Sequence, residues 1–182
     1  MKQYKELSLN EAYRVIGHGP VILVSSRSND GKYNIAPIAW NSPIKKEPCQ
    51  IIMEIGKRHK TYQNIVDTKE FIVSLPSIDQ VEIVRNTGSS KGSEIDKFEK
   101  FNIESFLGGK IKNKVPIECI AYLEFKVLEI IEREAAGLII GECVYASVDS
   151  TVFNERLLTE KKQAKTLHHL GGKVFCIPGD II

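Results

Sequence analysis

Residues 34–43 read N-I-A-P-I-A-W-N-S-P, an apolar stretch that carries the only tryptophan of the chain and two prolines. A proline has no N–H to give to a sheet ladder, so Pro37 and Pro43 indicate strands at the edge of a sheet. Backbone amides at such an edge are free to meet a ligand, and a flat ring would find an apolar wall beside them. The alternative is a buried tryptophan beside a kinked edge strand, which the residues by themselves favour.

The segments around this stretch predict an antiparallel sheet. Residues 21–26 are apolar and β-branched, and a strand over 33–41 follows them across Asn29-Asp30-Gly31, a hairpin turn in which Asp-Gly accepts positive φ. Further strands are expected at 51–55, 71–75, 118–131 and 136–149. Because strands and helices do not alternate as in βαβ units, we expect a mainly β fold with short helices, an antiparallel barrel rather than a Rossmann sheet.

Three short helices are expected between the strands. Ser8 and Glu11 have capping-box spacing and predict a helix that ends before Gly17. Residues 61–67 predict a second helix with Thr61 as its N-cap. The capping-box spacing recurs over 77–80 and predicts a third helix, which stops at Thr87-Gly88. A surface loop over 88–93 and a charged surface tail over 157–165, helical or extended, complete the interpretation.

The length and the net charge of the chain limit the functions that it can have. The 182 residues carry 25 basic and 23 acidic side chains, a formal net charge of +2. Such a balance draws the protein neither to nucleic acid nor to an anionic membrane, so any anion site must be local. No apolar run approaches the roughly 20 residues of a membrane helix, and the polar start lacks a signal peptide. We therefore expect one domain over residues 1–182, in the cytoplasm.

The cysteines and histidines show no metal or nucleophile pattern. Cys49, Cys119, Cys143 and Cys176 lie far apart in the sequence without a C-x-x-C pair, so neither a zinc site nor a dithiol motif is expected. We expect all four thiols to be reduced and structural. No Ser-His-Asp order and no ligand cluster stands out, which disfavours a hydrolase and a metalloenzyme.

A basic turn is the most informative polar motif. Residues 56–61 read G-K-R-H-K-T, four consecutive donors between a predicted strand and a predicted helix. The N-terminus of a helix offers unpaired N–H groups and partial positive charge, and arginine and threonine side chains add directional hydrogen bonds. A phosphate would be well held there. On composition alone, a solvated basic turn is an equal alternative.

In this order the segments resemble the flavin reductase-like family, most closely its flavoredoxin branch. The resemblance runs from Pro20 to about Pro178. It rests on N-I-A-P-I-A-W-N-S-P at 34–43, G-K-R-H-K-T-Y-Q-N-I at 56–65, E-F-I-V-S-L-P-S at 70–77, Thr87-Gly88, Asp96-Lys97-Phe98 and H-L-G-G at 169–172. It implies a split β-barrel that binds FMN noncovalently near the interface of a homodimer.

The resemblance also implies roles for particular residues. The FMN phosphate would be held by Arg58, Lys60 and Thr61, with His59 alongside it. The isoalloxazine ring would be lined by Ala39, Trp40, Asn41 and Ser42. Ser74 and Leu75 would approach the ribityl chain or the ring edge. His169 would lie near the ring or a reductant pocket, although a turn that packs the C-terminal strand is an equal alternative.

Three functions remain open at this point. The first is an NADH- or NADPH-dependent reductase of flavin or of a small acceptor, in which the chemistry takes place at flavin N5 and needs no acid or base side chain. The second is a flavoredoxin-like electron carrier that a redox protein partner reduces. The third is a barrel-type binding module whose basic turn holds another phosphate ligand.

Overall fold

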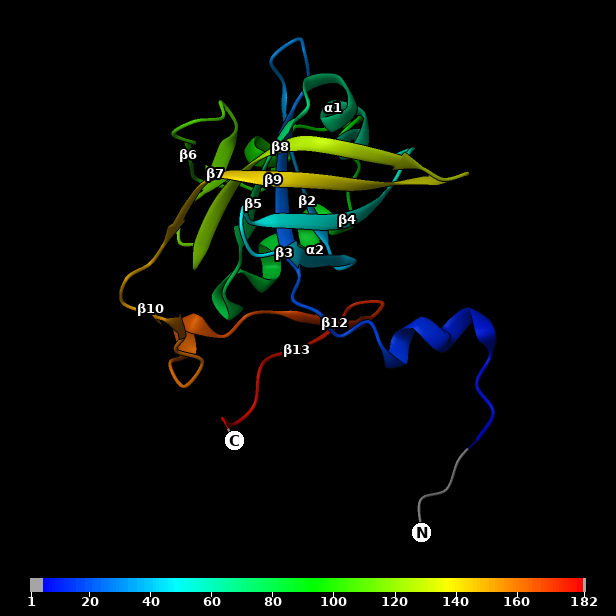
Figure 1. Cartoon of the computed structure of the whole chain (residues 1–182), viewed down its shortest axis with the longest axis vertical. Coiled ribbons are helices and arrows are strands. Elements are labelled where there is room, and N and C mark those ends of the chain that lie inside the picture. The colour runs from blue at the N-terminus through cyan, green and yellow to red at the C-terminus, as the bar shows by residue number, and fades with distance from the viewer. Residues whose placement is uncertain (1–4, 182) are drawn as a thin grey trace.

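The computed structural model describes residues 5–181, and its main element is a curled antiparallel sheet (Figure 1). Within these residues the sheet has seven strands in the order β2-β1-β5-β8-β9-β4-β3. The strands are β1 (Ile22–Arg27), β2 (Tyr33–Ile38), β3 (Asn41–Lys45), β4 (Gln50–Gly56), β5 (Glu70–Leu75), β8 (Ala121–Glu132) and β9 (Ala136–Val148). Since β2 also contacts β4, the sheet forms a split barrel. The mainly β, antiparallel prediction is confirmed.

The edges of the sheet lie where the prolines predicted them. Pro37 is in β2 and Pro43 in β3, the two edge strands. The hairpin between β1 and β2 is also confirmed, with Arg27 opposite Tyr33 and Gly31 at a φ of 88°. The two long strands β8 and β9 pair along most of their length, as expected.

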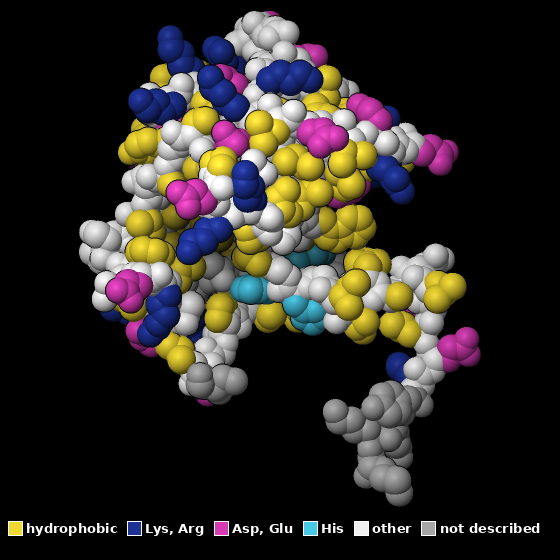
Figure 2. All heavy atoms as spheres, in the orientation of Figure 1, with side chains coloured by type: hydrophobic (Ala, Val, Ile, Leu, Met, Phe, Trp, Pro, Cys, Tyr) yellow, Lys and Arg dark blue, Asp and Glu magenta, His cyan; other side chains and the backbone are white. Residues whose placement is uncertain are grey.

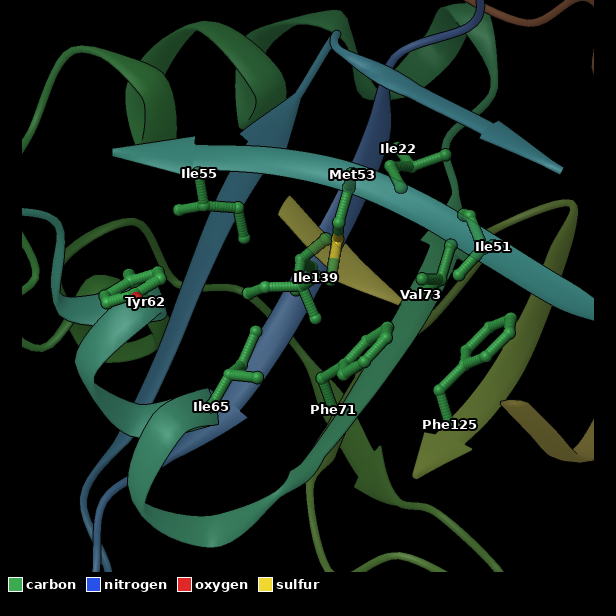
Figure 3. Close-up of a cluster of buried hydrophobic side chains, with 11 residues drawn as sticks. Ile22, Ile51, Met53, Ile55, Tyr62, Ile65, Phe71, Val73, Phe125 and Ile139 are labelled. Carbon is green, nitrogen blue, oxygen red and sulfur yellow. The ribbon is translucent and has the colours of Figure 1, made fainter. Parts of the chain in front are cut away.

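Alternating side chains fill the interior of the barrel. Along β4 the buried positions are Ile51, Met53 and Ile55, and they meet the stacked rings of Phe71 and Phe125, whose centroids are 5.2 Å apart (Figure 3). Each such side chain stabilises the fold by about 1.5–3 kcal/mol through removal from water.

The helices pack mainly against β1, β2 and β4. Helix α1 (Lys60–Thr68) lies against all three of these strands, while α2 (Val81–Gly88) and α3 (Lys97–Lys100) cover β2. A second apolar cluster, with Leu23, Ile35, Val84 and Phe98 at its centre, forms beneath α2 and α3. The smaller elements are β6 (Ser105–Leu107), β7 (Lys114–Pro116), β10 (Phe153–Asn154), β11 (Arg156–Leu157), β12 (His168–Gly171), β13 (Val174–Cys176) and the 3-10 helices η1 (Leu9–Val15), η2 (Ile78–Gln80) and η3 (Lys162–Ala164).

Two predicted helix starts need correction. Ser8 makes no capping hydrogen bond through its side chain, and η1 is a 3-10 helix with no buried residue, so no packing stabilises a longer α-helix. Helix α1 begins two residues early, with His59 as N-cap, because the backbone already turns at Gly56, whose carbonyl accepts from His59 N at 3.0 Å. The capping box predicted at Ser77 is confirmed.

The strand predicted over 33–41 ends at Ile38, and β3 begins at Asn41. The side chain of Asn41 explains the corner, because its Nδ2 donates to the carbonyls of Ile38 at 3.1 Å and Pro20 at 2.9 Å. These bonds hold the chain in a bend between two edge strands.

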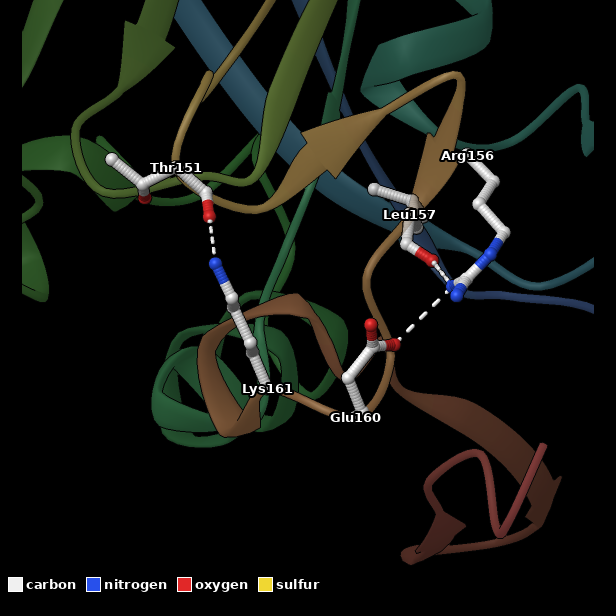
Figure 4. Close-up of polar contacts among 5 residues, drawn as sticks. All are labelled: Thr151, Arg156, Leu157, Glu160 and Lys161. Carbon is white, nitrogen blue, oxygen red and sulfur yellow. Dashed lines mark hydrogen bonds and ion pairs between the residues drawn. The ribbon is translucent and has the colours of Figure 1, made fainter.

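The charged tail forms a hairpin of β10 and β11 followed by η3. Arg156 Nη1 donates to the Leu157 carbonyl at 2.9 Å and to Glu160 at 3.2 Å, and Lys161 Nζ donates to the Thr151 carbonyl at 2.7 Å (Figure 4). The tail therefore lies on the surface, as expected, and is held mostly by local polar contacts. In the part of the chain that the structure describes, every helix is too short or too polar to cross a bilayer.

Candidate functional site

The basic turn before α1 divides into two parts. The Lys57 ammonium forms an ion pair with Glu132, and Tyr62 donates its hydroxyl to the same carboxylate at 2.7 Å. Both hydrogen bonds lower the pKa of Glu132, that from Lys57 more strongly. The Lys57 ammonium is thus already paired with a residue of β8, whereas the Arg58 side chain is exposed at the start of α1.

Two buried amides connect α1 with the barrel. Asn34 Nδ2 donates to Thr61 Oγ1 at 2.8 Å, and Asn64 Nδ2 donates to Ser26 Oγ at 3.1 Å. Asn34 is only 2% exposed, and its Oδ1 has no hydrogen-bond partner among the described residues. A buried acceptor of this kind is costly unless a donor reaches it.

The loop after α2 closes over Asn34. A Cβ built on Gly92 would lie 1.8 Å from Asn34 Oδ1, so only glycine allows this approach. At the end of α2, before this loop, a Cβ on Gly88 would lie 3.0 Å from Pro37 Cγ. The segment from Gly88 to Gly92 therefore lies close to β2 at two points.

Lys97 is a buried cation next to this turn. It is 3% exposed, and its Nζ donates to the Thr87 carbonyl at 2.6 Å. Within residues 5–181 no carboxylate lies within ion-pair distance of it. Burial lowers its pKa to about 8. Burial, followed by the charges of Arg58 and Lys97, lowers the pKa of His59.

These residues form one polar cradle, which we define as Asn34, Arg58, Thr61, Gly92 and Lys97. An ammonium has three donors, and among the described residues Lys97 has one acceptor, the Thr87 carbonyl. A buried charge without an opposite charge is unfavourable, so a bound anion would stabilise it. The cradle offers cationic donors for a phosphate at its basic side, whereas Asn34 Oδ1 is covered by Gly92.

A cavity of about 520 Å³ lies farther along β2. Its walls include Pro37, Ala39, Arg85, His169 and Phe175. The His169 ring is 5.4 Å from that of Phe175, and its Nε2 lies 3.0 Å from the Gly172 carbonyl oxygen. The Arg85 guanidinium lies 5.9 Å above the Phe175 ring and pairs with Glu82 at 2.6 Å. This cavity has apolar walls and a charged rim in which Arg85 is paired with Glu82.

Strand β2 connects the two features, because Asn34 is in the cradle while Pro37 and the following Ala39 line the cavity. Five residues of extended chain span about 17 Å. Residues an odd number of positions apart in a strand point to opposite faces, so Asn34 and Pro37 lie on opposite faces of the edge strand β2, and the cradle and the cavity are neighbours along the strand rather than on one face.

The sequence matches the flavin reductase like domain over residues 17–168. The chain belongs to the flavin reductase-like family. Three solved structures show its fold. Nitrilotriacetate monooxygenase component B from Bacillus cereus is 20% identical with a TM-score of 0.86, covering 100% of this chain and 98% of that one.

The names of the other two solved structures refer to flavin. An FMN-binding domain of a flavin reductases-like enzyme from Shewanella baltica is 25% identical, with a TM-score of 0.81 and coverage of 97% and 94%. Flavoredoxin of Desulfovibrio vulgaris is 21% identical, with a TM-score of 0.82 and coverage of 100% and 96%. At these identities the flavin reductase-like family is shown, whereas the flavoredoxin branch stays a prediction.

The structure places the predicted phosphate residues together. Arg58, His59, Lys60 and Thr61 occupy the start of α1, with Thr61 buried and the others more accessible. Ala39 and His169 also come together, on the walls of the cavity.

The remaining predicted ring residues are dispersed. Trp40 is 50% exposed and packs edge-on against Tyr13 at 5.6 Å, so it is not a core tryptophan. The Asn41 amide is committed to backbone carbonyls, and Ser42 is exposed. Ser74 is fully buried beside Cys119, and Leu75 packs into the apolar core, away from the cavity lining.

Sequence reasoning missed several members of the site. Lys97 and Gly92 were not recognised, and neither was the amide of Asn34, although the site-bearing motif contained it. Arg85 and Phe175 of the cavity were also missed. The available signal for Lys97 was its place between Asp96, which caps α3, and the buried Phe98.

Proposed function

We propose that this flavin reductase-like protein binds FMN noncovalently and transfers electrons from NADH or NADPH through it to free flavin or a small acceptor. The observation that carries the proposal is the buried Lys97 ammonium, which lacks a carboxylate partner among residues 5–181 and lies near Arg58 and the start of α1. A phosphate supplies the charge that this arrangement lacks. The FMN-binding relative from Shewanella baltica supports the choice of FMN.

The residues of the cradle fit the polar half of FMN. Arg58, Lys60 and Lys97 would face the phosphate, and α1 would offer the N–H groups of its first turn. Pro37 and Ala39 would bound the ring.

When bound, FMN supplies hydride and electron transfer through its N5 atom. The protein contributes position and environment. The apolar side chains of the cavity, Pro37 and Phe175 among them, exclude water from one side of the ring. Lys173 adds a positive charge to the cavity wall, where Arg85 is paired with Glu82, and would favour an anionic reductant or acceptor.

We further propose a homodimer. The exposed apolar side chains of β8 and β9 include Leu128, Ile131, Val144 and Tyr145. Figure 2 shows hydrophobic side chains gathered on the face where Figure 1 places β9 and β4. A surface of this kind gains free energy when a second copy covers it. Light scattering of the eluting protein at about twice 20.5 kDa would support the dimer, and a monomer mass would contradict it.

The experiment that tests the function is anaerobic stopped-flow absorbance of the FMN-loaded protein mixed with NADH and, separately, with NADPH. Rapid bleaching of the oxidised flavin band by either nucleotide is expected and identifies the donor. Bleaching by dithionite but by neither nucleotide would replace the reductase with an electron carrier reduced by a protein partner. If the protein retained no flavin, the remaining interpretation would be a binding module for another phosphate ligand.

A further inference from the structure

Cys49 and Cys143 are neighbours in the fold although they are distant in the sequence. Gln50 of β4 is opposite Glu142 of β9, and one step further Cys143 N donates to the Cys49 carbonyl at 2.9 Å. Residues opposite each other on antiparallel strands point to the same face. The hydrogen bond from Cys143 N to the Cys49 carbonyl brings the two backbones to ladder distance, where Cα atoms of opposite residues lie about 4.5–5.5 Å apart, within the range of about 4.4–6.8 Å that a disulfide bridges.

The two thiols differ in environment. Cys49 is exposed in the turn that leads into β4, whereas Cys143 is half-buried and packs against the barrel core. The Cys143 Sγ donates to the Tyr145 carbonyl at 3.2 Å. Burial raises the pKa of Cys143, and the nearby Cys49 raises it as well. Each thiol therefore lies within the electrostatic reach of the other.

We propose that Cys49 and Cys143 form a reversible cross-strand disulfide by exchange with a low-molecular-weight disulfide. The pair is a modification site separate from the proposed flavin chemistry, because β4 reaches the basic turn at its other end, Gly56. All four cysteines of the described chain are free thiols, so the structure shows the reduced form.

The exposed thiol reacts first. The Cys49 thiolate attacks one sulfur of the small disulfide, and the other sulfur leaves as a thiolate that takes up the proton lost by Cys49. Cys143 then loses its proton and attacks the Cys49 sulfur, which releases the second small thiol. Two protein thiols are oxidised, one S–S bond forms in the protein, and the small disulfide is reduced to two thiols. The raised pKa of Cys143 lowers the fraction of it that is thiolate at neutral pH.

The bond would tie the β3–β4 turn to β9. Glu47, Pro48 and Cys49 lie in this turn, and Cys143 lies on a strand inside the sheet. Closing the pair therefore restrains the turn without crossing the barrel. Slower hydrogen exchange at residues 46–49 in the oxidised protein is the expected structural consequence.

The test exposes the full-length protein to oxidised glutathione, blocks free thiols with an alkylating agent and maps tryptic peptides by mass spectrometry. Peptides 47–57 and 134–156 each hold one of the two cysteines. The expected product is a linked pair of these peptides that dithiothreitol separates. On a nonreducing denaturing gel the protein should run as a monomer, because the bond lies within one chain. Cys119 should be alkylated, and the exposed Cys176 should be either alkylated or carry glutathione, without a link to another peptide.

Two variants assign the steps. In Cys143→Ser the glutathione adduct on Cys49 should persist, and in Cys49→Ser the thiol at position 143 should stay alkylated. Cys176→Ser, which changes another exposed cysteine, should still form the bond. A stable glutathione adduct on Cys49 in the unsubstituted protein, with Cys143 free, would overturn the proposal. So would a linkage through Cys176.

Discussion

The polar cradle and the cavity beside it are built in opposite ways. In the cradle, Asn34, Thr61 and Lys97 are buried and belong to β2, α1 and α3, which hydrogen bonds and packing hold together. In the cavity, His169 and Phe175 are half-buried and come from the small C-terminal pair of β12 and β13. Long-range contacts fix the first region, whereas a short hairpin supplies one wall of the second.

Because the two regions are built differently, we expect one to determine FMN affinity and the other to determine the rate of turnover. A rigid, buried set of donors gives binding energy without a further ordering cost, so the cradle should determine FMN affinity. A hairpin wall can adjust to what lies beside the ring, so the cavity should determine how fast a reductant or acceptor reacts. Substitutions in the two regions should therefore change different measurements.

The largest effect is expected at Gly92. In Gly92→Ala the new Cβ would lie 1.8 Å from Asn34 Oδ1, and the loop must move. We expect about 1–3 kcal/mol less free energy of unfolding in urea and loss of most FMN binding in a fluorescence titration. Gly179→Ala is the control, because a Cβ there meets no atom within 4 Å. Retained FMN affinity in Gly92→Ala would remove this loop from the site.

Lys97→Met separates binding from stability. Loss of a charged donor should weaken FMN binding about 10- to 100-fold, corresponding to about 1.4–2.8 kcal/mol. The free energy of unfolding should stay constant or rise, because a buried charge without a carboxylate partner in residues 5–181 is removed. Lys100→Met on the same helix is the control, since Lys100 is exposed. Equal FMN affinities of the two variants would show that Lys97 does not face the phosphate.

Arg58→Ala should weaken FMN binding by about 1.5–3 kcal/mol, the range for hydrogen bonds to charged groups, and its exposure places the effect at the lower end. Its matched control is Lys57→Ala, because Lys57 is already paired with Glu132. Isothermal titration with FMN compares the two variants. Unchanged affinity in Arg58→Ala would remove Arg58 from the phosphate site.

The pH dependence of FMN binding should report Lys97. Burial lowers the pKa of Lys97 to about 8 in the free protein, and a bound phosphate would raise it. Affinity should therefore be full below pH 8 and fall as pH rises through 8 to the higher pKa of the complex, by at most about tenfold per pH unit. The FMN phosphate is already dianionic above pH 7, so its own titration does not interfere. Titrations between pH 7 and 9.5 should show this fall, which Lys97→Met should lack.

The smallest effect is expected in the cavity. His169→Ala removes the ring that packs against Phe175 and should lower the rate of FMN reduction by NADH or NADPH less than about tenfold, with FMN affinity unchanged. Stopped-flow absorbance and FMN titration measure the two quantities. His18→Ala is the control, because His18 contacts only the Arg14 carbonyl through its ring. A loss of FMN affinity in His169→Ala would erase the contrast between the two regions.

The first hairpin and the two edges of the sheet could be predicted because each depends on residues that are close together in the sequence. Asp30-Gly31 gave the first hairpin, and Pro37 and Pro43 marked the two edges of the sheet. The error at Thr61 has a tertiary origin, since its hydroxyl accepts from Asn34 of a distant strand, and His59, which makes no side-chain capping bond, occupies the N-cap position. The basic turn was found for the same reason as the hairpin, because its donors are consecutive.

The missed features depend on contacts between distant segments. Lys97 looks like an ordinary surface lysine until α3 packs on β2 and buries it. Gly92 looks like a flexible loop residue until Asn34 is placed against it. Cys49 and Cys143 become neighbours only when β4 pairs with β9. No spacing within the sequence encodes these three contacts, because each needs the register of the sheet.

Recognition of a phosphate by the cradle is the central property proposed for this protein. Fluorescence titrations with FMN and with riboflavin, which lacks the phosphate, test it directly. We expect FMN to bind at least about tenfold more tightly than riboflavin at pH 7, and we expect Lys97→Met to abolish most of that difference. Equal affinities for FMN and riboflavin in the unsubstituted protein would contradict the account.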